Sequence, residues 1–253
     1  MHALHEQYRP TSFEDVVGQD RAVRSIKQVI ARGWGGRAWW FTGFSGTGKS
    51  TLARIIAQHG ADEFGIEEID AGLLTPAALR EIEDGLRFRG LGNNPGRVVI
   101  VNEAHGLRRD TIRLLLVTLE RLPSHAVFIF TTTAQGQQSL FEHDVSGDAS
   151  PLLSRCTEIV LANDDEAKRA FAVRARQIAV AEGIDGVPEQ CYAAAAVSCK
   201  GNMRALLQRI ESGAFRQDAA AVLQREFDML RTTKGTVAAA RRETLEQLLK
   251  TLQ

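Results

Sequence analysis

The stretch RAWWFTGFSGTGKSTLARII, residues 37–56, combines an apolar strand pattern, a glycine-rich turn and a helical pattern in that order. Its centre, GFSGTGKS at residues 43–50, matches the pattern G-x-x-x-x-G-K-[ST] of phosphate-binding loops. Glycines let such a loop wrap so that backbone N–H groups point at phosphates, and the following helix start adds a favourable dipole. The stretch therefore predicts a nucleotide site between a strand and a helix of an α/β domain.

The residues of this loop have candidate roles in holding a triphosphate with its metal. Lys49 supplies a mobile positive charge, and Ser50 offers its hydroxyl to Mg²⁺. The expected nucleotide contacts are Gly43, Phe44, Ser45, Gly46, Thr47, Gly48, Lys49, Ser50 and Thr51. A glycine-rich turn that contains Lys-Ser by chance is the weaker interpretation, because the complete pattern lies between a strand and a helix.

Four more apolar runs with β propensity follow along the chain, at residues 65–70, 97–101, 126–132 and 157–162. Segments with helical periodicity separate most of these runs. The alternation of strand and helix patterns predicts a parallel sheet covered by helices. Thr75 before Pro76 is the expected N-cap of one such helix. Trp39 and Trp40 of the first run are expected to be sheet residues rather than a base-stacking platform.

The chain changes character after the last of these runs, where strand patterns stop. Three helical segments follow, with breaks at Gly183 and Gly201. We expect a nucleotide-binding α/β domain over 1–162, a small helical lid over 163–214, and a helical tail over 215–253. The tail is interpreted as a truncated collar or an interaction segment.

A second element for nucleotide chemistry is RVVIVNEAH, residues 97–105, in which an apolar strand ends in polar side chains. Glu103 is the candidate for polarising the attacking water, and a solvated acid at a strand end is the alternative. Asn102 stands where such sites usually carry a carboxylate. Its amide oxygen can accept from a magnesium-bound water but brings no charge. We therefore expect ATP and Mg²⁺ to bind and hydrolysis to be slow, and we expect His105 to lead into the next helix.

The amino-acid composition limits which binding partners and which cellular compartment we expect. Lys+Arg and Asp+Glu balance at 31 each, so affinity for nucleic acid must come from a local cluster. The sequence has no apolar run long enough for a bilayer and its first residues lack a signal-peptide core, so we expect a cytoplasmic protein. Cys156, Cys191 and Cys199 form no C-x-x-C pair, which favours reduced, mostly buried thiols over disulfides or a zinc site.

Six separated motifs carry a family resemblance: EQYRPTSFEDVVGQD (6–20), GFSGTGKST (43–51), VVIVNEAH (98–105), FIFTTT (128–133), LLSRC (152–156) and GNMRALL (201–207). With them the chain resembles the ATPases of the AAA+ superfamily. Within it, the chain is similar to the clamp-loader group of bacterial DNA polymerase III gamma/tau subunits and replication factor C small subunits. The resemblance implies a P-loop AAA+ parallel sheet flanked by helices and followed by a small three-helix lid.

The resemblance also implies where adenine would bind. In this group the N-terminal box surrounds the base, which here implies contacts from Tyr8, Arg9, Pro10, Val17 and Gly18.

Three further residues receive roles from the resemblance. Thr133 would hydrogen-bond the γ-phosphate or the attacking water, Arg155 would reach the ATP of an adjacent subunit, and Arg204 would reach back to its own ATP. An arginine acting in trans adds positive charge opposite the charge that develops on the phosphoryl group, and it makes turnover depend on assembly. Taken singly, each arginine is also typical of an exposed surface residue. The expected catalytic set is Glu103, Lys49, Thr133, Arg155 and Arg204.

The resemblance further implies DNA and protein partners. In the clamp-loader group, the helix start that here carries Arg108 and Arg109 and the helix start at Thr75 line the ring interior and track DNA phosphates. Such contacts carry no sequence information. The alternative is a solvated, capped helix end. Expected partners are the same or homologous AAA+ subunits, DNA, and a sliding clamp or other replication protein, with no membrane.

The sequence departs from the family pattern in several places. Asn102 replaces the expected aspartate, the segment 134–151 is long, only residues 215–253 stand where clamp loaders have a full collar, and the zinc module of gamma/tau subunits is missing. Our leading prediction is a clamp-loader-like ATPase that couples its nucleotide state to assembly on DNA or on a replication or repair partner. One alternative is an ATP-binding switch or scaffold subunit with little hydrolysis because of Asn102. The other is a Holliday-junction-type DNA-remodelling ATPase.

Overall fold

The computed structural model describes residues 3–142, 149–231 and 236–252, and the chain divides into two compact units. One unit is Pro10–Ala162, and the other joins Met1–Arg9 to Asn163–Gln253. The first nine residues thus group with the C-terminal helices, whereas the sequence places them in the α/β domain. The helices after Ala162 form one unit, so the boundary between a lid and a tail stays a prediction.

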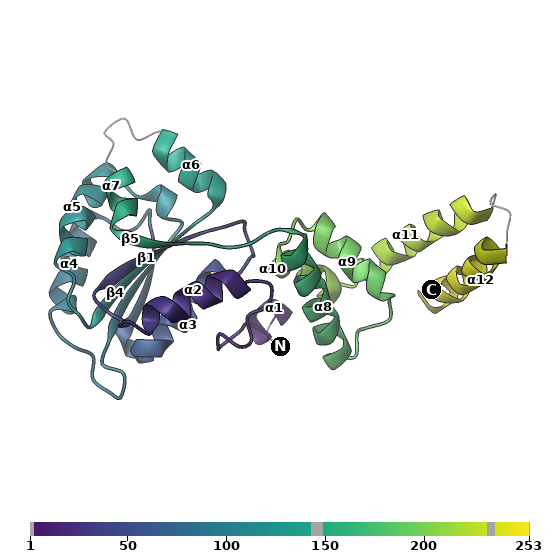
Figure 1. Cartoon of the computed structure of the whole chain (residues 1–253), viewed down its shortest axis with the longest axis horizontal. Coiled ribbons are helices and arrows are strands. Elements are labelled where there is room, and N and C mark those ends of the chain that lie inside the picture. The colour runs from purple at the N-terminus through teal and green to yellow at the C-terminus, as the bar shows by residue number, and fades with distance from the viewer. Residues whose placement is uncertain (1–2, 143–148, 232–235, 253) are drawn as a thin grey trace. The chain divides into compact units, whose positions relative to one another are not determined.

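A parallel five-stranded sheet forms the centre of the Pro10–Ala162 unit (Figure 1). The strands are β1 (Arg37–Thr42), β2 (Ile66–Asp70), β3 (Arg97–Asn102), β4 (Ala126–Thr132) and β5 (Cys156–Val160). Their order is β2-β3-β4-β1-β5, and every neighbouring pair is parallel. The carboxyl ends of all five strands consequently meet at one edge. The predicted parallel sheet is confirmed, with each strand where its apolar run lies.

Helices cover both faces of this sheet. They are α2 (Asp20–Ile30), α3 (Lys49–Gly60), α4 (Pro76–Leu86), α5 (Arg109–Glu120), α6 (Ala134–Glu142) and α7 (Ala149–Ser154), with the 3₁₀ turns η1 (Glu63–Gly65) and η2 (Ala104–Gly106). The hydroxyl of Thr75 accepts a hydrogen bond from the backbone N–H of Ala78 at 3.2 Å, so the predicted N-cap of α4 is confirmed.

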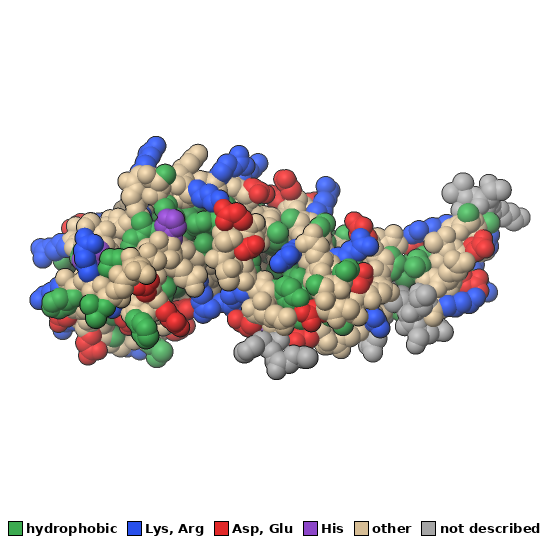
Figure 2. All heavy atoms as spheres, turned by 90° about the horizontal axis from the view of Figure 1, so that it is seen from below, with side chains coloured by type: hydrophobic (Ala, Val, Ile, Leu, Met, Phe, Trp, Pro, Cys, Tyr) green, Lys and Arg blue, Asp and Glu red, His purple; other side chains and the backbone are tan. Residues whose placement is uncertain are grey.

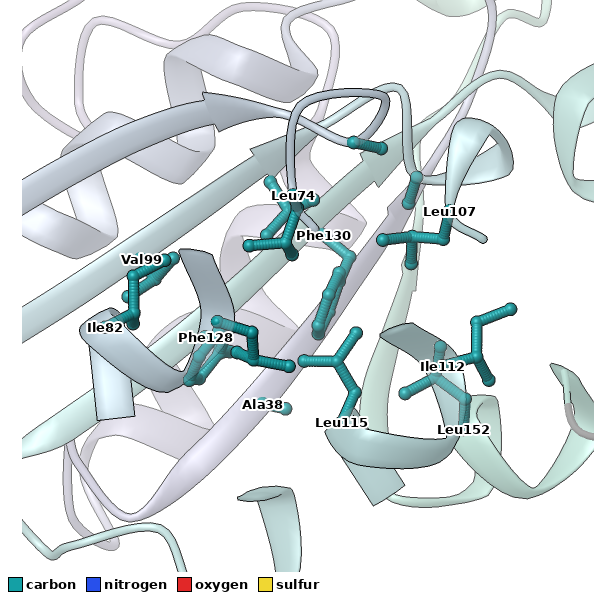
Figure 3. Packing of buried hydrophobic residues seen from close by; sticks show 14 of the residues in the cluster. Ala38, Leu74, Ile82, Val99, Leu107, Ile112, Leu115, Phe128, Phe130 and Leu152 are labelled. Carbon is teal, nitrogen blue, oxygen red and sulfur yellow. The ribbon is translucent and has the colours of Figure 1, made fainter. Parts of the chain in front are cut away.

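Successive strand residues point to opposite faces of the sheet and build two cores. Trp39 and Phe41 pack on the side of α2 and α3, whereas Trp40, Phe128 and Phe130 pack with α4, α5 and α7. Figure 3 shows this second core, where the phenylalanine rings of β4 meet leucine and isoleucine side chains of the helices. Both tryptophans are fully buried, which confirms them as sheet residues. Burying one such aromatic side chain contributes about 2 kcal/mol.

The second unit is helical. Its helices are α1 (Leu4–Gln7), α8 (Asp165–Ala181), α9 (Glu189–Ser198), α10 (Met203–Glu211), α11 (Ala214–Arg231) and α12 (Thr236–Leu252). The predicted breaks are confirmed, since Gly183 and Gly201 have φ of +69° and +70°, in the left-handed region that favours glycine. Leu223 of α11 and Leu245 of α12 share a core with α8, α9 and α10. In the described residues, every helix is too short or too polar to cross a bilayer.

Candidate functional site

The phosphate-loop motif connects β1 to α3 at the carboxyl edge of the sheet, as the sequence predicts. Gly46 and Gly48 have φ of +73° and +108°, a conformation that a side chain would strain. A Cβ at Gly43 would lie 2.9 Å from the Cβ of Leu161, so this position also requires glycine. Helix α3 begins at Lys49, so its first backbone N–H groups, which have no partner inside the helix, lie at the loop. The backbone therefore forms a cradle suited to an anion.

The side chain of Lys49 lies inside this cradle. It is only 8% exposed, and its ammonium donates to the carbonyl oxygens of Gly43 at 2.9 Å and Phe44 at 2.8 Å. The hydroxyl of Thr47 also donates to the carbonyl of Phe44, at 2.8 Å. Ser50 is half-buried at the start of α3. A buried ammonium within a ring of backbone groups is the charge that a polyphosphate requires.

Gln19 is a site residue that the sequence did not reveal. It is 2% exposed at the start of α2. Its side-chain Nε2 donates to the carbonyls of Ala162 at 2.9 Å and Thr47 at 3.4 Å, and its Oε1 accepts from the N–H of Ala162 at 2.8 Å. These bonds tie the N-terminal box to the phosphate loop and to the segment after β5. In the sequence, only the position of Gln19 next to Gly18 in the segment 6–20 could have indicated a role at this site.

The five residues assigned to adenine are divided between the two units. Pro10, Val17 and Gly18 belong to the sheet unit, and Gly18 has a left-handed φ of +67°. Tyr8 and Arg9 belong to the helical unit. The Tyr8 hydroxyl donates to Oε1 of Glu182 at 2.6 Å, and this hydrogen bond raises the pKa of the tyrosine above its usual value. The guanidinium of Arg9 pairs with Glu6 at 2.6 Å. A shared adenine contact stays a prediction.

Asn102 ends β3 and is held by both neighbouring strands. Its Nδ2 donates to Oε1 of Glu68 on β2 at 2.7 Å, and its Oδ1 accepts from the hydroxyl of Thr131 on β4 at 2.9 Å. The other carboxylate oxygen of Glu68 accepts from Nε and Nη2 of Arg54 on α3, at 3.0 and 2.8 Å. The sequence did not reveal Glu68, because an acid in the alternating run GIEEID is typical of a solvated strand face. Both polar atoms of the Asn102 amide are therefore engaged by the protein.

Glu103 follows directly, and its backbone is strained. Its φ of +52° and ψ of +48° lie in the left-handed region, where a non-glycine residue costs about 1 kcal/mol or more. Its side chain is 53% exposed, with Oε2 3.5 Å from Nδ1 of His105. The same ring nitrogen lies 3.2 Å from the hydroxyl of Thr132. His105 lies in η2, ahead of α5, as predicted, and it also links Glu103 to the end of β4.

Thr133, the residue after β4, caps α6. Its hydroxyl oxygen accepts from the backbone N–H of Gly136 at 2.9 Å, which leaves its proton available for donation to another acceptor. A Cβ at Gly136 would lie 2.4 Å from Nδ1 of His105, so the histidine ring packs directly on this turn. Gln137 of α6 was also not revealed by the sequence. Its Oε1 accepts from Nε1 of Trp40 at 3.1 Å and from the hydroxyl of Thr42, which fixes α6 to the end of β1.

Arg155 lies at the opposite edge of the sheet from the phosphate loop. It directly precedes β5, whose first residue, Cys156, pairs with Ala38 near the start of β1, whereas the loop follows Thr42 at the end of β1. The four-residue step along β1 from Ala38 to Thr42 corresponds to about 13 Å between Arg155 and the level of the phosphate loop. The guanidinium forms an ion pair with Glu120 of α5 and donates to the carbonyl of Pro151. This placement is consistent with an arginine that acts on another subunit.

The candidate DNA residues lie at a helix start. Arg108 is the N-cap residue of α5 and Arg109 its first residue, and both are exposed. The hydroxyl of Thr111 donates to the carbonyl of Leu74 at 2.9 Å, which joins the start of α5 to the segment that precedes α4. On the face shown in Figure 2, basic and acidic side chains are interspersed, in keeping with the balanced composition. Arg204 is exposed on α10 of the helical unit, and its contact with ATP stays a prediction.

The groups at this edge of the sheet fit a magnesium-bound triphosphate. Ser50 offers a hydroxyl, and Asn102 and Glu103 offer oxygen atoms, which are the ligand atoms that Mg²⁺ prefers. The glycine conformations and the buried ammonium of Lys49 supply the anion cradle beside them.

Comparison with known proteins identifies this arrangement. Residues 39–159 match the family described as "ATPase family associated with various cellular activities (AAA)". These residues form an AAA domain. The match covers the AAA domain from β1 to β5, including the phosphate loop, Asn102, Glu103 and Arg155.

The curated relatives are gamma and tau subunits of DNA polymerase III. The chain is 28% identical over 183 residues to DNA polymerase III subunit gamma of Buchnera aphidicola subsp. Baizongia pistaciae, covering 63% of this chain and 46% of that protein. It is 32% identical over 155 residues to DNA polymerase III subunit tau of Escherichia coli, covering 51% of this chain and 24% of that protein. The chain thus spans less than half the length of these relatives. The resemblance to clamp-loader-type AAA+ ATPases is confirmed.

Solved structures support the same fold. A mutant of Thermotoga maritima RuvB matches with a TM-score of 0.65 and 19% identity, covering 86% of this chain and 68% of that chain. The Thermotoga maritima RuvB Holliday junction branch migration motor matches with a TM-score of 0.57 and 19% identity, covering 97% and 72%. At these identities the likeness shows the fold alone, and it confirms the AAA+ sheet followed by helices.

Proposed function

We propose that this chain is a clamp-loader-type ATPase module that binds ATP with Mg²⁺ and hydrolyses it slowly. Its nucleotide state would couple to assembly on DNA or on a replication or repair partner. The observation that carries the proposal is the phosphate loop, whose glycines adopt left-handed conformations around the buried ammonium of Lys49. The AAA domain and the gamma and tau relatives support the same function.

In the proposed complex, the loop from Gly43 to Thr51 holds the phosphates through backbone N–H groups and Lys49. Ser50 and Asn102 would hold magnesium, which would neutralise phosphate charge. Adenine lies against the N-terminal box, from Tyr8 to Gly18. Gln19 would keep that box in register with the loop, because its side chain bonds to Thr47 and to Ala162.

In the proposed hydrolysis, water attacks the γ-phosphorus and the bond to the bridging oxygen breaks, giving ADP and phosphate. Glu103 orients the water and accepts its proton. The Thr133 hydroxyl donates to the γ-phosphate or to the water, a role supported by the hydrogen that its capping bond leaves available. Glu103 lacks a carboxylate neighbour at Asn102, which supports a low rate.

Assembly would complete the site. Arg155 of a neighbouring subunit adds positive charge to the transferred phosphoryl group, and Arg204 contacts the chain's own ATP. The position of Arg155 at the amino edge of the sheet, away from its own phosphate loop, supports the action in trans. The exposed Arg108 and Arg109 at the start of α5 would contact DNA phosphates without reading sequence.

A second candidate function is an ATP-dependent switch that hardly hydrolyses its nucleotide. The observation that favours it is the amide of Asn102, whose two polar atoms are bonded to Glu68 and Thr131. The likeness to a branch migration motor concerns the fold alone, so it does not favour the Holliday-junction-type alternative.

Calorimetry and a turnover assay test the proposal together. The wild-type chain should bind Mg-ATP, Lys49→Ala should lose most of that affinity, and Glu103→Gln should keep the affinity while losing turnover. Turnover is measured with and without primed DNA. A wild-type rate no higher than that of Glu103→Gln under either condition would identify the switch. The absence of any binding heat with Mg-ATP would reject both functions.

A further inference from the structure

We propose that Glu68 is a positioning residue of this site: it fixes the orientation of the Asn102 amide, and it makes asparagine rather than aspartate the matching residue at position 102. The inference rests on the proposed function, because it concerns the same magnesium-nucleotide site. It assigns a role to a strand residue outside the recognised motifs.

The contact between the two side chains has only one possible polarity. Glu68 lies on β2, and the strand register pairs Asp70 of β2 with Asn102 of β3, so Glu68 is a diagonal neighbour of Asn102. The distance of 2.7 Å from Nδ2 to Oε1 is in the short range typical of hydrogen bonds to a charged acceptor. An ionised carboxylate can only accept, so the NH₂ group of the amide must face Glu68.

Fixing the NH₂ group also fixes the amide oxygen. Oδ1 of Asn102 is directed toward β4, where it accepts from the Thr131 hydroxyl at 2.9 Å. A carbonyl oxygen has two acceptor sites, so one remains for a magnesium-bound water. If the amide rotated by half a turn, it would present donors instead, which a hydrated cation cannot use. Glu68 therefore determines that Asn102 presents oxygen to the nucleotide side.

The carboxylate of Glu68 is itself held in place. Nε and Nη2 of Arg54 both donate to its Oε2, which leaves Oε1 for Asn102. Arg54 lies on α3, the helix whose first residues are Lys49 and Ser50. The chain of contacts thus runs from the phosphate-loop helix through β2 and β3 to β4, and it sets the amide relative to the loop.

Because of this network, an aspartate at position 102 should weaken magnesium-dependent ATP binding rather than strengthen it. Asn102→Asp would place two carboxyl groups at hydrogen-bond distance, where either both charges repel each other or one carboxyl takes up a proton, and each outcome offsets the added negative charge. Glu68→Gln would remove the charge and allow an amide-to-amide contact in either polarity, so the orientation would be lost. The double variant Glu68→Gln with Asn102→Asp restores a single bond of reversed polarity, in which the new glutamine donates to the new aspartate.

The test measures ATP affinity by calorimetry in Mg²⁺ and in EDTA for the wild type, both single variants and the double variant. We expect the gain in affinity from Mg²⁺ to fall about tenfold in each single variant, the size of one charge-assisted hydrogen bond, and to return in the double variant. The affinity in EDTA is the baseline for each variant, so the effect of each substitution's own charge on the phosphates is subtracted from the magnesium gain. Glu67→Gln is the matched control, because Glu67 is the neighbouring acid on β2 and points to the opposite face of the sheet.

Several results would overturn the proposal. An undiminished magnesium gain in Glu68→Gln would remove Glu68 from the site, as would tighter Mg-ATP binding by Asn102→Asp than by the wild type. If Asn102→Asp does not fold, the comparison of Glu68→Gln with Glu67→Gln decides alone. Absence of ATP binding by the wild type is a separate outcome, which rejects the proposed function and this inference together.

Discussion

Replacing Gln19 by alanine removes a buried connection between three segments of the Pro10–Ala162 unit. The side chain makes bonds of 2.8 and 2.9 Å with the backbone of Ala162 and a longer bond of 3.4 Å with Thr47. Each of the two short bonds contributes about 1 kcal/mol. Removing them also leaves backbone groups of Ala162 without this partner, which raises the expected loss to about 2.5 kcal/mol. With a denaturant slope of about 2 kcal/mol per molar urea, the unfolding midpoint should fall by about 1 M.

Tryptophan fluorescence can follow this change in the Pro10–Ala162 unit alone. The chain has three tryptophans, Trp34, Trp39 and Trp40, and all three lie in the Pro10–Ala162 unit. Gln28→Ala is the control, since Gln28 is an exposed glutamine of the same helix, and it should shift stability by no more than about 0.5 kcal/mol. A Gln19→Ala midpoint as close to the wild type as that of the control would refute the structural role of Gln19.

Further changes test other parts of the structure. Gly48→Ala forces a side chain into a backbone with φ of +108°, so it should abolish ATP binding in calorimetry while far-ultraviolet circular dichroism still reports a folded chain. Arg155→Ala should leave the ATP affinity of the single chain unchanged and lose turnover. Mixing it with Glu103→Gln should recover turnover, because the intact Glu103 of the first variant then meets the intact arginine of the second; a mixture no more active than either variant alone would contradict action in trans. Burial raises the pKa of the Cys156 thiol to about 12, so alkylation at pH 8 followed by mass spectrometry should find it unmodified in the folded chain. The same shift stabilises the folded state below the ordinary thiol pKa, and this contribution should be lost as the pH rises from about 9 toward 12.

The sequence was sufficient for features that depend on neighbouring residues. The positions of β1, β3 and β4 followed from continuous apolar runs, as expected when strands are buried on both faces. The phosphate loop followed from its glycine spacing, and the cap at Thr75 followed from its place before Pro76. Each of these signals lies within a few consecutive residues, so no knowledge of the strand order was needed.

Features that depend on the order of strands in the sheet could not be predicted. Glu68 and Asn102 are 34 positions apart in the chain, and they meet only because β2 lies beside β3. Gln19 and Ala162 are 143 positions apart, and they meet because α2 packs against β5. A glutamine or a glutamate has many possible partners, so its residue type gives no indication of which one it meets.

The left-handed backbone of Glu103 has a consequence for how this turn responds to substitution. Only glycine adopts this conformation without steric conflict, so Glu103→Gly would relax the turn by about 1 kcal/mol while it deletes the carboxylate. Thermal resistance and turnover would then move in opposite directions. A sequence optimised for stability alone would favour glycine here, so an acid at this strained position is what the proposed role of Glu103 in hydrolysis would require.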